Sequence, residues 1–212
     1  MPRILFIHGA ATTAAVWSRT IARLDGYDVE AIDRPSTGNL DLELEWLAAY
    51  ASGALVVGAS GGATLCLALA ASTIDIAAGI AHEPAVGSLL PELLAPVASA
   101  FAEGGAAGMG AALYGPLWRP EMAPDADAVS RDLGMFRAFE PEPPRVGNGR
   151  VLVTTGERSP DIRRLAADRL SAALGYDTAT LPGCAHLVAL EAPDVLAAWI
   201  AATADAIEVG GK

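Results

Sequence analysis

Residues 53–71 read GALVVGASGGATLCLALAA and specify the architecture of the chain. The run Gly53–Gly58 is short, apolar and without polar alternation, which predicts a strand buried on both faces. The stretch Ala63–Ala71 is rich in Ala and Leu and predicts a buried helix. Between them lies Gly58–Gly62, which matches G-x-S-x-G with Ser60 at its centre. A nucleophilic serine on a tight turn from strand to helix needs such small neighbours, because that turn is strained and crowded.

The remainder of the chain alternates between strand-like and helix-like segments. Strands are predicted at residues 3–7, 27–32, 53–58, 76–81, 151–155 and 177–181, and helices at 17–24, 40–51, 63–71, 162–174 and 195–207. Strands that alternate with such helices form parallel βαβ units, and helices then cover both faces of the sheet. We therefore predict an α/β fold with a mostly parallel sheet of about six strands and helices on both faces.

Residues 85–150 interrupt this alternation. They are rich in Gly, Ala and Pro and are expected to be helical or loop-like. We predict a single domain over residues 1–212, in which residues 85–145 form a small helical cap over one end of the sheet. Trp118, Met135 and Phe136 are the cap side chains expected to contact a substrate, although packing within the cap would explain each of them equally well.

Composition narrows the class of partner. The chain has 212 residues, a hydrophobic fraction of 52% and a formal net charge of −11. Such a chain can bury a sizeable core, and its acidity disfavours nucleic-acid binding, which depends on neutralising phosphates. No apolar run is long enough for a membrane span or a signal peptide. The two cysteines form no disulfide framework, so we expect a reducing, cytoplasmic setting.

Two further motifs stand at predicted strand ends. Residues 8–10 (HGA) follow the first strand, and residues 181–186 (LPGCAH) lie between the last strand and the last helix. The chain contains three histidines, at positions 8, 82 and 186. Because a serine nucleophile needs a neighbouring base and His8 lies in the first turn, the base is His186 or His82.

These motifs occur in the order typical of the α/β-hydrolase superfamily, which the sequence resembles over nearly its whole length. The resemblance implies that Ser60 is the nucleophile and His186 the base. It also implies an oxyanion hole made by the backbone N–H groups of Ala10 and Gly61. The active site is then expected at the carboxyl edge of the sheet, beneath the cap.

The acid of the triad is the point at which the sequence departs from that family pattern. The usual Gly-x-x-Asp loop places Ser159 where the aspartate is expected. Glu83, at the end of the fourth strand, is the favoured replacement, because a carboxylate there is costly without a partner such as an imidazole. Some branches of the superfamily take their acid from this strand. Asp161 is the fallback, and the absence of any acid is the third possibility.

The function predicted from the sequence is hydrolysis of a small uncharged carboxylic ester or thioester by a Ser-His-acid triad. A lyase or C–C hydrolase on the same fold, or a protein that binds a small ligand without turnover, are the alternatives. The chain lacks the glycine-rich signatures of dinucleotide and P-loop sites, and no residues have zinc-like spacing, so no cofactor and no metal are expected. A small-molecule substrate is the only partner predicted, with neither nucleic acid nor membrane; the oligomeric state is left open.

Overall fold

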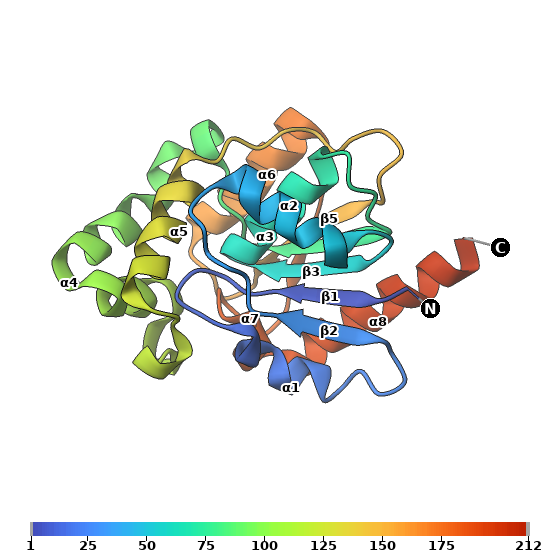
Figure 1. The fold of residues 1–212 in the computed structure, drawn as a ribbon, viewed down its shortest axis with the longest axis horizontal. Coiled ribbons are helices and arrows are strands. Elements are labelled where there is room, and N and C mark those ends of the chain that lie inside the picture. The colour runs from blue at the N-terminus through green and yellow to red at the C-terminus, as the bar shows by residue number, and fades with distance from the viewer. Residues whose placement is uncertain (1, 211–212) are drawn as a thin grey trace.

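The computed structural model describes residues 2–210 and contains one sheet of six parallel strands, which confirms the predicted fold class. The strands lie in the order β2-β1-β3-β4-β5-β6 (Figure 1). Their bounds are β1 (Ile4–Ile7), β2 (Val29–Ile32), β3 (Leu55–Ala59), β4 (Ala78–His82), β5 (Val151–Gly156) and β6 (Asp177–Leu181). Because all strands are parallel, their carboxyl ends share one edge of the sheet.

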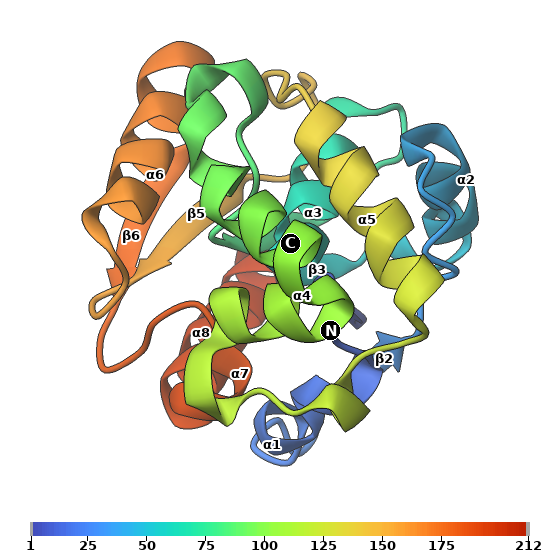
Figure 2. The same ribbon diagram turned by 90° about the vertical axis from the view of Figure 1, so that its left-hand side faces the viewer.

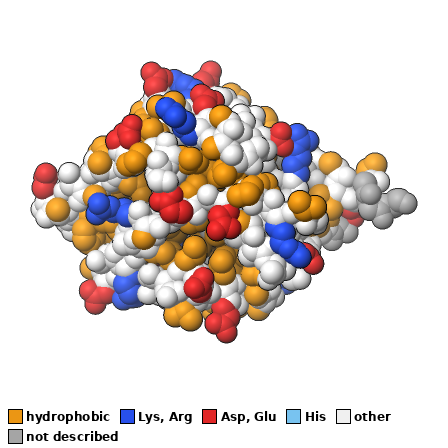
Figure 3. All heavy atoms as spheres, turned by 90° about the horizontal axis from the view of Figure 1, so that it is seen from above, with side chains coloured by type: hydrophobic (Ala, Val, Ile, Leu, Met, Phe, Trp, Pro, Cys, Tyr) orange, Lys and Arg blue, Asp and Glu red, His pale blue; other side chains and the backbone are white. Residues whose placement is uncertain are grey.

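Helices cover both faces of the sheet. The helices α2 (Leu40–Ala51), α3 (Gly61–Ala71) and α6 (Asp161–Leu174) lie on one face, and α1 (Ser18–Ile21), α7 (Val188–Glu191) and α8 (Pro193–Gly210) on the other (Figure 2). Within residues 2–210, none of the helices combines the length and the apolar composition that crossing a membrane requires. On the face seen from above in Figure 1, basic side chains are scattered among acidic ones (Figure 3).

The predicted helix at residues 17–24 is replaced by two shorter elements. A 3₁₀ turn, η1 (Ala14–Trp17), leads into the single turn of α1. The amides of Arg23 and Leu24 then bond to carbonyls three residues earlier, and Gly26 follows with a positive φ of 87°. Tightening of the last turn and a left-handed glycine end the helix before it can reach its predicted length.

The centre of the core is the unit formed by β3, the turn at Ser60 and α3. Ten of the eleven residues of α3 are buried, because the helix is apolar all round and contacts β1, β3 and β4. Strand β1 is likewise completely buried along its four residues. The carboxyl end of β3 is therefore held rigidly, and this is the end that carries Ser60.

The chain leaves the sheet between β4 and β5. This segment contains η2 (Gly87–Leu89), η3 (Pro91–Leu94), α4 (Ala95–Tyr114), η4 (Gly115–Leu117), η5 (Pro120–Met122) and α5 (Ala126–Ala138). Helices α4 and α5 lie across the carboxyl edge of the sheet, towards which the strand arrows point (Figures 1 and 2). Helix α4 is interrupted at Gly105, where φ is 57°. We refer to residues 85–145 as the cap, because they cover the edge at which the candidate site lies.

Candidate active site

Ser60 occupies a strained turn between β3 and α3. Its φ of 54° and ψ of −120° are unusual for a residue with a side chain. The turn is held by two backbone hydrogen bonds, from the Ser60 amide to the His82 carbonyl (2.9 Å) and from the Thr64 amide to the Ser60 carbonyl (3.0 Å). The strain is thus maintained by the surrounding β4 and α3, and it projects the serine from the carboxyl edge of the sheet.

The glycines that flank Ser60 are required by close backbone contacts. A Cβ on Gly58 would lie 2.2 Å from the carbonyl oxygen of Gly62. A Cβ on Gly62 would lie 1.9 Å from the carbonyl oxygen of Ile7 in β1. Both distances are far below van der Waals contact, so the G-x-S-x-G pattern and the glycine after it reflect the packing of α3 against β1 and β3.

Glu83 and His186 come together from distant parts of the chain. His186 lies in the loop between β6 and α7, and its Nδ1 is 2.7 Å from Oε2 of Glu83. Glu83 directly follows β4 and has a positive φ of 53°. Both side chains are buried. Asp161, the alternative acid, is 95% exposed and pairs with Arg164 at the surface. The structure therefore places Glu83 beside the imidazole and Asp161 away from it.

The loop after β5, which the family resemblance expected to supply the acid, supplies hydrogen-bond donors instead. The hydroxyl of Ser159 and the amide of Gly156 both donate to Oε1 of Glu83, the latter at 2.9 Å. Glu83 thus keeps Oε2 for the imidazole while Oε1 is held by two donors. Ser159, which stands where the family pattern has an aspartate, therefore orients Glu83, the candidate acid at the end of the neighbouring strand β4.

The electrostatics of this cluster favour an ionised Glu83 and a neutral His186. Burial alone would raise the pKa of Glu83, but the hydrogen bond with His186 and the nearby Arg163 guanidinium hold it well below its usual range. Burial lowers the pKa of His186 to about 4, and Arg163 acts in the same direction, against the effect of Glu83. A neutral imidazole that donates Nδ1–H to Glu83 carries its lone pair on Nε2.

Nε2 of His186 is the atom that a general base would use. It is buried and has no hydrogen-bond partner within residues 2–210. A buried polar nitrogen without a partner costs free energy, so packing alone does not explain an unpaired acceptor at this place. Catalytic hydrogen bonds are often long in structures without substrate and shorten when substrate binds.

Tyr114, the last residue of α4, lies next to His186, although nothing in the sequence sets it apart from the other large cap residues. Its ring stacks on the imidazole of His186, with centroids 5.4 Å apart and an interplanar angle of 16°. Its hydroxyl donates to the carbonyl of Ala10 at 2.7 Å. A Cβ on Gly9 would meet both this hydroxyl (2.6 Å) and Cβ of Ser60 (2.9 Å), so the cap tyrosine and the serine converge on one turn.

A small cavity lies on the side of Ser60 that faces the cap. Its volume is about 20 Å³, enough for one or two water molecules. The predicted oxyanion residues Ala10 and Gly61 line it together with Ser60. The remaining lining residues are Thr64, Glu83, Ala85, Leu94, Val97, Met109, Leu113, Leu133, Phe136 and Arg163. The lining is therefore mostly apolar, and its polar side chains are those of Ser60, Thr64, Glu83 and Arg163.

Only one of the three predicted substrate-contacting residues lines this cavity. Phe136 lies against Gly61, where a Cβ would come within 2.3 Å of its ring. Trp118 is instead buried and donates its indole N–H to the carbonyl of Ala11 at 2.8 Å, and Met135 is buried away from the cavity lining. Trp118 and Met135 therefore pack within the cap and do not line this cavity, and their contact with a substrate stays a prediction.

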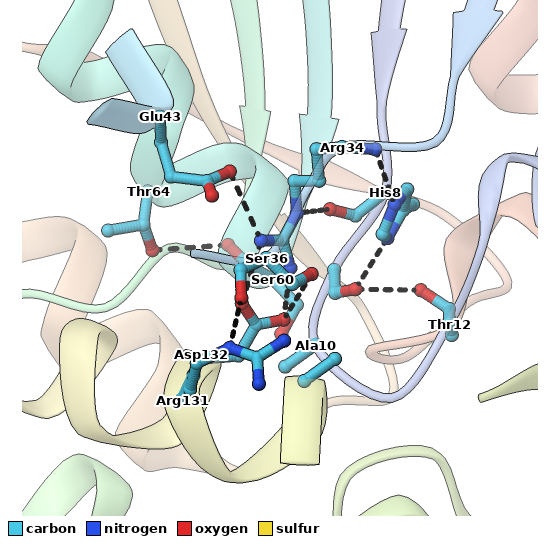
Figure 4. A network of polar contacts seen from close by, with 12 residues as sticks. His8, Ala10, Thr12, Arg34, Ser36, Glu43, Ser60, Thr64, Arg131 and Asp132 are labelled. Carbon is cyan, nitrogen blue, oxygen red and sulfur yellow. Dashed lines mark hydrogen bonds and ion pairs between the residues drawn. The ribbon is translucent and has the colours of Figure 1, made fainter. Parts of the chain in front are cut away.

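A buried ionic cluster joins the cap to the sheet edge (Figure 4). Arg34, after β2, forms a two-pronged ion pair with Asp132 of α5, and its Nη1 lies 3.5 Å from Oε2 of Glu43 in α2. Its Nε donates to the carbonyl of His8 at 3.3 Å. The Arg34 guanidinium also lies 5.4 Å from the ring centre of Phe136. This cluster fixes α5, and with it the wall of the cavity.

His82 and the two cysteines are engaged in packing and hydrogen bonds within the fold. His82 contacts the Thr154 hydroxyl and the Ala185 carbonyl, both at 3.0 Å, so its two ring nitrogens are occupied. Burial raises the pKa of the Cys184 and Cys66 thiols to about 12, which leaves neither as a nucleophile. Across residues 2–210, no three or more His, Cys, Asp or Glu side chains are grouped so that they could hold a metal ion.

Comparison with known proteins identifies the class to which this fold and site belong. A sequence model described as the alpha/beta hydrolase family matches residues 4–199, so the chain belongs to the α/β hydrolase family. No curated protein sequence matches the chain significantly.

Solved structures with this fold include enzymes of several activities. The enol-lactonase from Burkholderia xenovorans LB400 is similar with a TM-score of 0.73 and 18% identity, over 96% of this chain and 91% of that one. MenH from S. aureus is similar with a TM-score of 0.73 and 16% identity, over 98% and 94%. The carboxylesterase CesB from Bacillus subtilis is similar with a TM-score of 0.64 and 16% identity, over 95% and 83%. At these identities the likeness shows the fold alone.

Proposed function

We propose that the protein is a serine hydrolase that cleaves a small carboxylic ester or thioester through Ser60, His186 and Glu83. The observation that carries the proposal is the 2.7 Å contact between Nδ1 of His186 and Oε2 of Glu83 beside a serine on a strained turn. A buried, unpaired Nε2 on the same imidazole supplies the base.

The proposed reaction has two halves. Oγ of Ser60 attacks the acyl carbonyl and gives its proton to Nε2 of His186, while Glu83 stabilises the resulting imidazolium. The negative charge on the carbonyl oxygen is stabilised by the backbone N–H groups of Ala10 and Gly61, the latter at the N-terminus of α3. The alcohol or thiol leaves with the proton from His186.

Water completes the cycle. It attacks the acyl-serine and gives one proton to Nε2 of His186, which passes it to Oγ of Ser60 as the acid departs. The neutral state of His186 at and above pH 6.5 is suited to this step, because burial keeps the pKa of the imidazole at about 4. We also propose a cytoplasmic setting, which the two free and buried cysteines, Cys66 and Cys184, support.

Labelling with a fluorophosphonate tests the nucleophile directly. Intact masses are recorded for the native protein and for Ser60→Ala after incubation with the probe. We expect one adduct on the native protein and none on the variant, followed by turnover of short-chain p-nitrophenyl or methyl esters. Absence of an adduct on both proteins would overturn the hydrolase proposal and favour the alternative of a small-ligand-binding protein. Labelling without ester turnover would direct the search to lyase or C–C hydrolase substrates.

A further inference from the structure

Arg163 is a cation in the wall of the reactive cavity that the proposed triad does not use. It lies in the first turn of α6, and its side chain is 11% exposed. It is the only lysine or arginine among the cavity-lining residues, which otherwise include Leu94, Val97 and Leu133. A guanidinium in such apolar surroundings is costly unless it has a partner.

The hydrogen-bonding capacity of Arg163 is largely unused. Its Nε lies 3.5 Å from Oε2 of Glu83, which is the one ion pair that it forms with residues 2–210. No side-chain or backbone acceptor in that part of the chain receives a hydrogen bond from its two Nη groups. A guanidinium carries five N–H donors, so most of the donors of this partly exposed group are available for a ligand.

Neutralisation of Glu83 does not by itself account for Arg163. Glu83 already accepts hydrogen bonds from Gly156, Ser159 and His186. An arginine that serves a carboxylate normally presents two parallel N–H groups, whereas Arg163 offers only Nε, at 3.5 Å. Its remaining donors are those that match a second carboxylate, because the planar fork of a guanidinium suits that group.

The placement of the cavity shows which half of a substrate would meet Arg163. Ala10 and Gly61, the proposed oxyanion donors, line the cavity, whereas His186 does not. The leaving group must lie on the side of His186, because Nε2 protonates it. The cavity therefore lies on the acyl side of Ser60, and its volume of about 20 Å³ must widen when a substrate binds.

We infer that Arg163 binds a carboxylate on the acyl half, so that the preferred substrate is a half-ester or half-thioester of a short dicarboxylic acid. This inference rests on the proposed function and refines its substrate class. The acidic composition favours an uncharged substrate only at long range, where salt screens the net charge. At contact distance, the attraction between a guanidinium and a carboxylate is stronger than that screened repulsion.

Selectivity between matched esters tests this inference. Monomethyl esters of succinic, glutaric and adipic acid are compared with the corresponding dimethyl esters at pH 8, where His186 is neutral. For the best chain length we expect native kcat/KM to be at least about tenfold higher for the monoester, a difference of about 1.4 kcal/mol. In Arg163→Gln this ratio falls to about one or below, and Arg163→Lys recovers part of it. Arg164→Gln, which removes a neighbouring surface arginine, leaves the ratio unchanged.

Two outcomes would overturn the inference without touching the hydrolase proposal. One is native protein that favours the dimethyl esters at every length. The other is Arg163→Gln that lowers kcat/KM for both esters by the same factor, which would mean that Arg163 serves Glu83 alone. Labelling of Ser60 by the fluorophosphonate is scored separately, because it does not involve a carboxylate.

If no ester is turned over, binding decides the inference. Calorimetry with succinate, glutarate and adipate is then carried out on the native protein, Arg163→Gln and Arg164→Gln. Binding that is lost only in Arg163→Gln supports a carboxylate site at this arginine. Absence of binding, or equal binding by all three proteins, contradicts it. Thermal melting of each variant confirms that it is folded.

Discussion

Arg34 is buried and Arg163 is mostly buried, and both lie next to carboxylates at the carboxyl edge of the sheet, but they are bonded very differently. Arg34 uses Nε for the His8 carbonyl and both Nη groups for Asp132. Within residues 2–210, the Arg163 guanidinium makes one ion pair, through Nε with Glu83 at 3.5 Å. The first guanidinium has its donors satisfied by the protein, whereas the second has most of them free.

The same contrast extends to the groups around the two arginines. Near Arg34, Oε1 of Glu43 accepts from the amide and hydroxyl of Thr37, so the carboxylates are also fully engaged. Near Arg163, Nε2 of His186 is buried without a partner. A saturated buried network stabilises one conformation, whereas unsatisfied groups in an otherwise well-packed core are retained for a ligand or a proton. We therefore infer that the Arg34 cluster (Arg34, Glu43 and Asp132) stabilises the fold. We infer that the Glu83 cluster (Glu83, Arg163 and His186) takes part in the proposed reaction.

The largest expected effect is on rate, from Glu83→Gln. An amide cannot stabilise the imidazolium and favours the wrong tautomer of His186. The equivalent change in one serine protease lowers kcat by about 10⁴-fold, and we expect a loss of that order here. Steady-state kinetics on the best ester measure it. Asp161→Asn is the control, since Asp161 pairs with Arg164 at the surface, and it should change kcat less than twofold.

A large loss in Asp161→Asn with a small loss in Glu83→Gln would reverse this assignment. In that case the contact between Glu83 and His186 would be structural, and the contrast between the two clusters would fail. The melting temperature of Glu83→Gln separates a loss of chemistry from a loss of folded protein.

Asp132→Ala should produce the largest loss of stability. Within residues 2–210 it leaves the buried Arg34 guanidinium with Glu43, at 3.5 Å, as its remaining carboxylate, and removal of one partner from a buried ion pair typically costs about 3–5 kcal/mol. Urea unfolding measures the free energy. The double variant Arg34→Met with Asp132→Leu should recover most of the loss, because it removes both charges and keeps an apolar contact. A loss below about 1 kcal/mol in Asp132→Ala would show that the cluster does not hold the cap.

The parts of the molecule that the sequence predicted are those determined by local pattern. The apolar run of β3, the glycines around Ser60 and the apolar α3 each carry their own signal within about twenty residues, and the fold class followed from such runs. Glu83 was favoured as the acid for a local reason as well, because an ionisable group at the end of a buried strand requires a partner.

What the sequence did not reveal depends on pairs far apart in the chain. Arg163 has the pattern of an ordinary surface arginine in the first turn of an amphipathic helix, and only the fold brings it to Glu83 and the cavity. Tyr114 could not be told apart from the other apolar cap residues, because its ring contact with His186 joins α4 to a loop 72 residues later. The sequence likewise could not show that Phe136 lines the cavity and Trp118 does not, because this depends on how the cap helices pack.

The pH dependence of kcat/KM distinguishes a charge effect of Arg163 from its proposed carboxylate contact. The base must be neutral, and the pKa of His186 is about 4, so activity on a neutral ester should rise with pH through that value and then level off. Removing the positive charge in Arg163→Gln makes protonation of His186 easier and moves this acid limb to higher pH. Glu83 and His82, which also face the imidazole, are unchanged in the variant. Arg164→Gln should not shift the acid side of the pH profile. If Arg163→Gln does not shift it either, the Arg163 charge does not influence the pKa of His186.

The smallest expected effect comes from Tyr114→Phe, which keeps the stacked ring and removes the hydroxyl that donates to the Ala10 carbonyl and lies beside the Ser60 and Thr12 hydroxyls. A neutral hydrogen bond is worth about 1 kcal/mol, so we expect a loss of that size in stability. Because this hydroxyl joins the cap to the turn that carries the proposed oxyanion donor Ala10, kcat should also fall, by about two- to fivefold. Tyr176→Phe is the matched control: its hydroxyl donates to the Glu142 carbonyl, at 2.9 Å, far from Ser60. It should cost similar stability and leave kcat unchanged. An increase of kcat in Tyr114→Phe would show instead that the hydroxyl restrains Ser60, and would place Tyr114 with the satisfied, structural groups of the Arg34 cluster.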